Sequence, residues 1–258
     1  MLQAAAPLET FDEIDSTILE ARRRAEFGDF GPVWLLTRRQ SAGRGRRGRA
    51  WATIPGNLFA TYLGRSGRPP GDIALLGFAA GLAIAEALDA RLGGAKAKLK
   101  WPNDVMIDGA KVSGIMLDSG AAAPAGSLGG YWFALGFGVN VAGAPKGLDQ
   151  PTACLADFTA DPVPAPEALL QEIRPRLEGW AQRLDGEGFG ALREAWMARA
   201  LGLGRTVEIR FGDEIVAGEV SGLSARGELE IMTASGRRTI AAGDVHFPQQ
   251  ASSSKGAA

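Results

Sequence analysis

A glycine- and arginine-rich segment, GRGRRGR at Gly43–Arg49, carries the first side chains whose types and spacing could do chemistry. Its three glycines let the backbone approach a ligand, and its four arginines present planar groups that suit phosphate and carboxylate. Ordering such a loop costs about 1–2 kcal/mol per residue, whereas one charge-assisted hydrogen bond returns about 1.5–3 kcal/mol. We therefore expect a mobile loop that closes around a ligand with several acceptors. A nucleic-acid patch and a solvated basic surface remain open as alternatives.

A predicted hairpin within Lys100–Ile115 brings a carboxylate and an ammonium group together. Asp108-Gly109 is typical of a two-residue turn and sets the register of the two strands. The predicted cross-strand pairs are Ile107 with Ala110, Met106 with Lys111, Val105 with Val112 and Asp104 with Ser113. Alternation puts Asp104, Lys111 and Ser113 on one face, with the Cβ atoms of Asp104 and Lys111 about 7–8 Å apart. Such a pair could hold a phosphate and an acyl carboxylate, or it could be an ordinary cross-strand ion pair.

The composition excludes several kinds of active site. The 258-residue chain has one cysteine, Cys154, and one histidine, His246, so neither an internal disulfide nor a zinc site of Cys or His ligands is expected. Its net charge is −1, but Phe30–Gly71 contains eight arginines and no Asp, Glu or Lys. No Walker A lysine and no Rossmann glycine loop occur in the required context. We therefore expect Cys154 and His246 to be structural residues.

The elements that must position these groups follow from apolar runs between Gly and Pro. Strands are predicted at Val33–Thr37 and Leu58–Leu63, and within Lys98–Asp118 and Tyr131–Val141. Helices are predicted at Asp72–Leu92, with Asp72 as N-cap and Gly93-Gly94 as the end, at Glu167–Leu184 and at Glu187–Ala200. Short alternating runs over Gly204–Phe247 favour a small barrel.

The length favours one core with a small appendage. We expect a main domain over residues 1–201, a small β domain over 202–248 and a disordered tail over 249–258. The N-terminal residues show no basic segment ahead of an apolar one, and the longest uncharged run is interrupted by glycine and proline. No signal peptide and no membrane span are therefore predicted, and a cytoplasmic protein is expected.

Two shorter motifs each have two interpretations. GFGVN at Gly136–Asn140 places two glycines in a predicted strand, which indicates either the close approach of a ligand or of another chain segment, or packing alone. Asp15-Ser16-Thr17 precedes a helical pattern, where Ser or Thr often caps the helix. Capping alone and contact with a ligand both remain open there.

Together these motifs resemble those of biotin protein ligases. The resemblance rests on DST at Asp15–Thr17, Gln40 with GRGRRGR and Trp51, KWPND at Lys100–Asp104, KVSGI at Lys111–Ile115 and GFGVN at Gly136–Asn140. Residues Gly204–Phe247 are similar to the family's SH3-like C-terminal domain. The resemblance implies an α+β fold, a mixed sheet with flanking helices related to lipoate ligases and class II synthetases. It also implies two steps: biotin and MgATP form biotinyl-5′-AMP, and the biotinyl group then passes to a lysine of a biotin carboxyl carrier protein.

The resemblance also implies roles for residues that match the motifs. The implied biotin-binding residues are Ser16, Thr17, Gln40, Arg44, Gly45, Arg46, Lys111 and Gly114. The implied ATP- or adenylate-binding residues are Arg46, Arg47, Arg49, Trp51, Lys100, Asn103 and Asn140. The implied catalytic residues are Lys111, Arg46 and Asp104, the last either binding Mg²⁺ or orienting the incoming lysine. Because both nucleophiles arrive with the substrates, such an enzyme needs positioning and charge neutralisation rather than a catalytic Cys or His.

Two residues depart from the family's pattern. Ile18 stands where Asn or Gln usually follows Ser-Thr, and Ala50 stands where lysine is common. Only fourteen residues precede Asp15, too few for a helix-turn-helix domain, so no binding to operator DNA is expected. A lipoate or octanoate ligase or transferase of the same fold, and a nucleic-acid-binding module, remain alternatives. The sequence leaves open whether the chain forms a homodimer.

Overall fold

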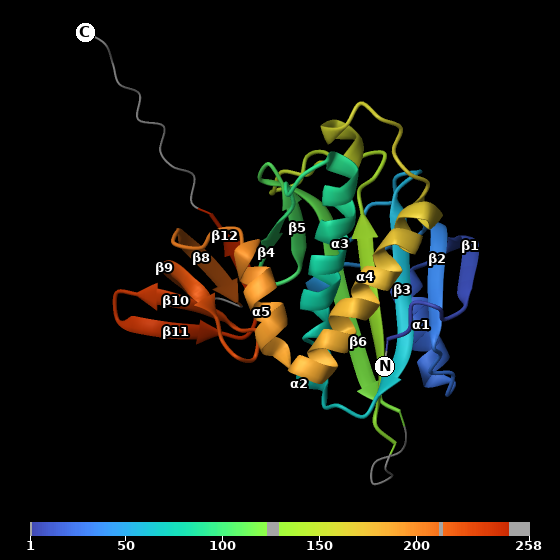
Figure 1. Ribbon diagram of the computed structural model, residues 1–258, viewed down its shortest axis with the longest axis horizontal. Helices are drawn as coiled ribbons and strands as arrows, with labels where there is room; N and C mark the ends of the chain where they lie inside the picture. The colour runs from blue at the N-terminus through green and yellow to red at the C-terminus, as the bar shows by residue number, and fades with distance from the viewer. Residues whose placement is uncertain (1, 123–128, 212–213, 248–258) are drawn as a thin grey trace.

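The computed structural model describes residues 2–122, 129–211 and 214–247 (Figure 1). The tail that was expected to be disordered, residues 249–258, lies outside the described residues. The described part contains one seven-stranded mixed sheet and one five-stranded antiparallel sheet. The predicted α+β class, a mixed sheet with flanking helices and a small C-terminal β unit, is therefore confirmed.

The seven-stranded sheet has the order β1-β2-β3-β7-β6-β5-β4. Its strands are β1 (Leu8–Ile14), β2 (Val33–Gln40), β3 (Leu58–Ser66), β4 (Lys98–Lys100), β5 (Asp104–Ile107), β6 (Ala110–Ala121) and β7 (Tyr131–Val139). β1 and β2 pair in parallel through α1 (Thr17–Glu26), and the other neighbouring strands pair antiparallel. The predicted Lys98–Asp118 region is thus divided among three strands, and the strand predicted to reach Val141 ends at Val139.

Helices cover both faces of this sheet. α1 packs on one face, while α3 (Leu76–Leu92) and α4 (Pro166–Glu187) cross the other in Figure 1. In β2, Val33 and Leu35 pack with α1, whereas Trp34 and Leu36 belong to the core under α3 and α4. A strand buried on both faces is expected to be a continuous apolar run, which explains why β2 was predictable. Glu187 closes α4 instead of opening α5 (Phe189–Ala198).

The predicted helix Asp72–Leu92 is in fact divided at Ala74–Leu75. A short α2 (Pro70–Ile73) is joined to α3 by bonds between residues three apart, from Leu75 N to Asp72 O and from Phe78 N to Leu75 O. Asp72 lies inside α2, so its predicted role as N-cap is wrong. Gly93 ends α3 in the left-handed conformation, as predicted. The Pro70–Leu92 segment is long and apolar enough to span a membrane, but 78% of its most apolar window is buried inside the protein.

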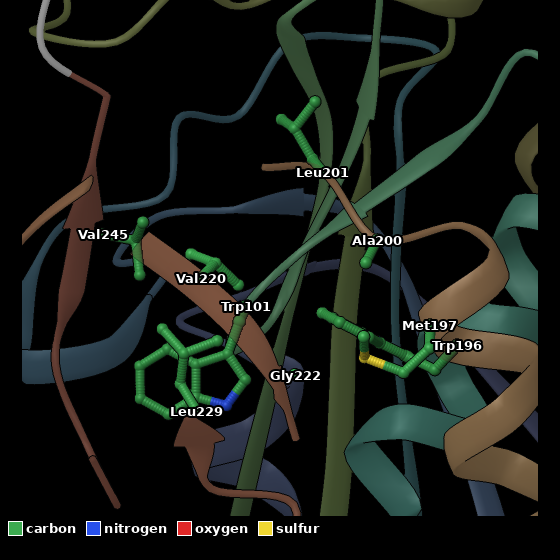
Figure 2. Close-up of a pocket in the computed structure, with 9 residues that line it drawn as sticks. All are labelled: Trp101, Trp196, Met197, Ala200, Leu201, Val220, Gly222, Leu229 and Val245. Atoms are coloured by element: carbon green, nitrogen blue, oxygen red, sulfur yellow. The ribbon is translucent and has the colours of Figure 1, made fainter. Parts of the chain in front are cut away.

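The C-terminal sheet has the order β11-β10-β9-β8-β12. Its strands are β8 (Thr206–Phe211), β9 (Glu214–Leu223), β10 (Leu229–Thr233), β11 (Gly236–Ile240) and β12 (Asp244–His246). Trp101 joins this sheet to the larger one: its ring lies among Val220, Leu229 and Val245 (Figure 2), and its Nε1 donates to Gly227 O at 3.0 Å. The cavity at this seam measures about 10 Å³, so the two sheets are packed together rather than separated by a ligand pocket.

Candidate active site

The start of α1 presents two buried hydroxyl groups. Ser16 and Thr17 are 1% and 4% exposed, and the Ser16 side chain makes no capping hydrogen bond. Asp15 accepts from Ser16 N and from both terminal nitrogens of Arg23, and these bonds hold the pKa of Asp15 below its usual value. Side-chain capping therefore does not explain why a serine stands at position 16. Its backbone N–H is held by Asp15, which is in turn paired with Arg23.

Thr17 belongs to a polar cluster without net charge. Gln40 Oε1 accepts from Thr17 N at 3.0 Å, and Thr61 Oγ1 donates to Thr17 Oγ1 at 2.8 Å. All three residues are buried, although they come from α1, β2 and β3. Thr61 was missed in the sequence because a single Thr within an apolar strand gives no signal. An uncharged cluster of hydroxyl and amide groups suits a neutral polar ligand group.

The predicted hairpin forms, but its register shifts once. Asp108 and Gly109 have φ values of 48° and 78°, and Met106 lies opposite Lys111 as predicted. A bulge then inserts Val112, so that Val105 faces Ser113 and Asp104 faces Gly114. The predicted pairs of Val105 with Val112 and of Asp104 with Ser113 are therefore wrong. Sequence alternation alone does not reveal a single extra residue in one strand.

The bulge has a direct effect on Lys111 and Asp104. Lys111 Nζ lies 2.7 Å from Asp104 Oδ1, with side-chain exposures of 16% and 12%. A Cβ at residue 114 would come within 3.1 Å of Lys111 Nζ, so the glycine leaves space for the ammonium group. Asp104 Oδ1 has no hydrogen-bond partner of suitable geometry among the described residues, although its charge is paired. The ion pair balances the charge of Asp104, and this oxygen can still accept a hydrogen bond from a further donor.

Trp51 lies flat against two glycines of the sheet. A Cβ at Gly138 would be 2.4 Å from Trp51 Cε2, and one at Gly114 would be 2.8 Å from Trp51 Cζ3. Lys111 Nζ lies 5.4 Å from the ring centroid, and Trp51 Nε1 is buried without a hydrogen-bond partner in the described part of the chain. Both glycines of GFGVN therefore serve close approach, Gly138 to the Trp51 side chain and Gly136 to the side chains of Thr61 and Ile18. The buried Trp51 donor lies beside Lys111.

We predict that Gly138→Ala destabilises the protein by about 1–3 kcal/mol, because the new Cβ forces Trp51 or β7 to move. Denaturant unfolding measures this loss. Gly190→Ala is the matched control, since a Cβ at this position in α5 meets no atom within 4 Å. A Gly138→Ala variant as stable as the wild type would contradict the close packing of Trp51.

The arginine loop, Gly43–Trp51, is closed by its own backbone. Arg44 and Ala50 form an antiparallel bridge, Trp51 N donates to Gly43 O at 2.9 Å and Gly45 N donates to Arg49 O at 2.8 Å. A 3₁₀ turn over Arg46–Gly48 forms its tip. The loop thus presents successive arginines in different directions.

The four loop arginines have different environments. Arg46 is half-buried and donates to Asn103 Oδ1 at 3.0 Å, and its pKa is lowered by burial and then by nearby Arg47. Arg47 and Arg49 instead form ion pairs with Asp244 of β12. Arg44 is exposed and makes no ion pair with any residue that the structure describes. Among the predicted ligands of this loop, Arg46 is therefore the one directed at the KWPND segment.

Two further predicted residues lie beside Lys111. Lys100 is half-buried and donates weakly to Gln150 Oε1 at 3.4 Å, and burial lowers its pKa. Asn140 is 2% exposed, and its amide donates to Ala153 O at 3.1 Å and to Lys111 O at 3.5 Å. Through these two hydrogen bonds, the Asn140 side chain holds the backbone of Lys111 next to that of Ala153. Its assignment to the adenylate remains a prediction.

Buried Asn57 also escaped the sequence prediction. Its Oδ1 accepts from the backbone N–H groups of Val141, Ala142 and Gly143, and so fixes the turn after β7. Asp244 was missed as well, because no motif connects β12 with a loop near residue 47. The roles of Asn57 and Asp244 both depend on contacts between residues far apart in the sequence, which no local motif reveals.

The polar cluster and the cations lie on one face of the sheet. Thr61, Gly114 and Gly138 face the α1 side, since their strand neighbours Ala60, Ile115 and Phe137 belong to the core on the other side. Lys111 forms an ion pair with Asp104, Lys100 lies opposite Asp104 as its cross-strand neighbour, and Arg46 reaches the adjacent Asn103. In the described residues no three His, Cys, Asp or Glu side chains could jointly hold a metal ion. The face can therefore bind an uncharged polar group next to an anion.

Comparison with known proteins gives consistent matches. The model described as "Biotin/lipoate A/B protein ligase family" matches residues 30–125, and "Biotin protein ligase C terminal domain" matches residues 202–247. A biotin–acetyl-CoA-carboxylase ligase of Paracoccus denitrificans is 39% identical, covering 90% of this chain and 97% of the relative. The corresponding ligase of Mycobacterium tuberculosis is 30% identical, covering 92% and 88%. A biotin protein ligase from Aquifex aeolicus in complex with biotin and ATP has a TM-score of 0.76 at 26% identity, covering 93% of this chain and 97% of that one.

Proposed function

This chain belongs to the biotin protein ligase family, and we propose that it activates biotin with ATP and transfers the biotinyl group to a lysine of a biotin carboxyl carrier protein. One observation supports this proposal most strongly: the neutral Thr17–Gln40–Thr61 cluster lies on the same face of the sheet as Lys111 and Arg46. The first suits an uncharged polar head group, and the second suits a carboxylate and a phosphate. We propose residues 1–201 as the catalytic domain and 202–248 as the second domain, with both acting in the cytoplasm, where ATP is available.

In the first step, a carboxylate oxygen of biotin attacks the α-phosphorus of ATP. The new bond is an acyl phosphate, the broken bond joins the α- and β-phosphates, and pyrophosphate leaves. No proton needs to move, so the protein's task is to bring two anions together. Lys111 and Arg46 are the cations proposed for that task. Their electrostatic interactions with the reacting groups are expected to be stronger in the transition state than with the separate substrates.

In the second step, the carrier lysine attacks the acyl carbon, and AMP leaves as the amide forms and the amine loses a proton. Asp104 forms an ion pair with Lys111, and its Oδ1, which makes no hydrogen bond within the described part of the chain, can still accept a donor. An incoming amine is such a donor. This arrangement favours Asp104 as the residue that orients the lysine.

Magnesium enters this proposal as part of the substrate MgATP. Mg²⁺ is commonly held by phosphate oxygens with only one or two protein carboxylates, and it neutralises charge on the phosphates. Asp104 fits poorly as a resident ligand, because Lys111 is already 2.7 Å away and Lys100 and Arg46 are near. No step of the proposed reaction therefore requires a metal ion bound by the protein itself.

The first half-reaction tests the proposal without a carrier. Purified protein with biotin and MgATP is expected to release pyrophosphate and to retain biotinyl-5′-AMP, detected by mass spectrometry after rapid filtration. Lipoate and octanoate are the matched alternative acids, and we expect neither to form a comparable amount of adenylate. Preferential activation of lipoate or octanoate would replace the biotin assignment with the related acyl specificity.

Replacing Cys154 with Ser separates the ligase from a transferase that uses a cysteine nucleophile. Cys154 is buried, and burial followed by the neighbouring Asp157 raises the pKa of its thiol. We expect Cys154→Ser to form adenylate and to modify the carrier at rates within about twofold of the wild type, since a buried small residue tolerates this change. Loss of carrier modification in a folded variant would contradict the ligase mechanism.

The alternative of a nucleic-acid-binding module is not favoured by the geometry. Arg47 and Arg49 are engaged by Asp244, and Arg46 is directed at Asn103. A loop that binds phosphate backbones is expected to present its arginines together to solvent.

A further inference from the structure

The C-terminal sheet holds the arginine loop through one carboxylate. Asp244, the first residue of β12, lies 3.1 Å from Arg47 Nη1 and 2.8 Å from Arg49 Nη2. The three residues are separated by 197 and 195 positions in the chain, so the contact closes the loop against a different sheet. Arg46, which directly precedes Arg47 in the sequence, is directed instead at Asn103.

The strand that carries Asp244 is itself firmly anchored. Val245 is buried in the seam beside Trp101 (Figure 2), while β12 pairs with β8 through all three of its residues. Phe247 follows, with Arg205 at 4.9 Å and Lys100 at 5.9 Å from its ring centroid. The backbone at Asp244 is therefore held in place by its neighbours, whereas the loop that it contacts is rich in glycine and has a more flexible backbone.

The conformation of the loop backbone links the position of Arg46 to the contacts of Arg47 and Arg49. Arg47 has a φ of 56°, in the left-handed region that non-glycine residues adopt rarely. In this turn Arg47 and Arg49 reach Asp244 on one side while Arg46 reaches Asn103 on the other. Without Asp244, Arg47 and Arg49 lose the ion pairs that hold this turn against β12.

We infer that Asp244 is a positioning residue of the proposed ligase, which holds the arginine loop closed so that Arg46 faces the bound acyl-adenylate. Asp244 acts through Arg47 and Arg49 rather than by touching a substrate. This inference rests on the proposed function and extends it, because it makes the C-terminal sheet part of the machinery that retains the intermediate. The ion pairs are partly exposed and contribute little to folding, so the effect is expected in loop closure and catalysis rather than in stability.

Limited trypsin digestion tests the contact without substrates. Asp244→Asn removes the charge but keeps the shape, and we expect cleavage after Arg47 and Arg49 to be about threefold faster or more. Glu214→Gln is the matched control, because it breaks another exposed ion pair of the same sheet, Glu214–Arg238, which includes no residue of the arginine loop. Equal digestion of the wild type and both variants, mapped by mass spectrometry, would overturn the inference.

Kinetics then test the positioning role. Asp244→Asn is expected to raise the KM for ATP and the release rate of the adenylate by about 3- to 10-fold, with the melting temperature and the rate of carrier modification at saturation little changed. Asp244→Glu should restore most of the loss, and Glu214→Gln should show none. Adding Asp244→Asn to an Arg47→Ala, Arg49→Ala variant should cause no further loss, because the partners are already gone. An unchanged KM in Asp244→Asn, or the same change in Glu214→Gln, would overturn the role; a wild type without activity would instead reject the proposed function and leave the trypsin result to decide the contact.

Discussion

Lys111→Ala is expected to slow formation of biotinyl-5′-AMP by about 10²- to 10³-fold, because the variant removes the cation that we propose to contact both the carboxylate and the α-phosphate. Lys111 is directed into the site by the bulge at Val112 and by the absence of a side chain at Gly114. No other lysine is paired with Asp104 among the described residues. Single-turnover pyrophosphate release measures the effect directly on the first step.

A loss of folding must be separated from this loss of chemistry. Removing Lys111 leaves the largely buried Asp104 carboxylate without its ion pair. Because this side chain is 12% exposed and Lys100 lies opposite it, we expect a loss of unfolding free energy smaller than the about 3–5 kcal/mol typical of a fully buried pair. The double variant Lys111→Ala, Asp104→Asn removes both charges and should regain much of that stability while remaining inactive. Wild-type rates of adenylate formation in either folded variant would show that Lys111 is not the central cation.

Arg46→Ala should produce the second large effect, a loss of about 10²-fold in adenylate formation or retention, because the variant removes the half-buried guanidinium that we propose to contact the phosphate. Arg46 is the loop arginine that reaches the site, through Asn103. The adenylate release rate, followed by filtration and mass spectrometry, distinguishes poor retention from slow formation.

Arg38→Ala provides the control for Arg46→Ala. Arg38 belongs to the same arginine-rich stretch but is 68% exposed and pairs with Asp12 and Glu167 on the surface. Exposed ion pairs of this kind contribute about 0–1 kcal/mol, so activity should stay near that of the wild type. Equal losses in Arg38→Ala and Arg46→Ala would indicate a general effect of net charge and would contradict the assignment of Arg46.

The hairpin illustrates how far the sequence could be used to predict the site. Asp108-Gly109 determines its turn locally, so the turn and the nearest pair, Met106 with Lys111, were predictable. The bulge at Val112 depends on how the strand also joins the segment at Pro151, whose carbonyl accepts from Lys111 N. The sequence therefore predicted Asp104 and Lys111 on one face, with an ion pair between them as one interpretation, whereas the predicted register beyond Met106 was wrong.

Other parts of the site depend on contacts that no local pattern contains. Thr61 becomes a polar partner only because α1 brings Thr17 against β3. Asp244 reaches Arg47 only because Trp101 packs the C-terminal sheet against the KWPND segment. The motifs thus predicted which residue types would gather, whereas the connections that orient them required the folded chain.

The most direct test of the central claim is modification of a biotin carboxyl carrier domain. The purified protein, biotin and MgATP are incubated with a carrier domain that the Paracoccus denitrificans ligase modifies in a parallel reaction, and the carrier is analysed by intact mass and peptide mass spectrometry. We predict one biotinyl group in amide linkage to one carrier lysine, dependent on both biotin and MgATP. A carrier that the relative biotinylates but this protein leaves unmodified would contradict the account.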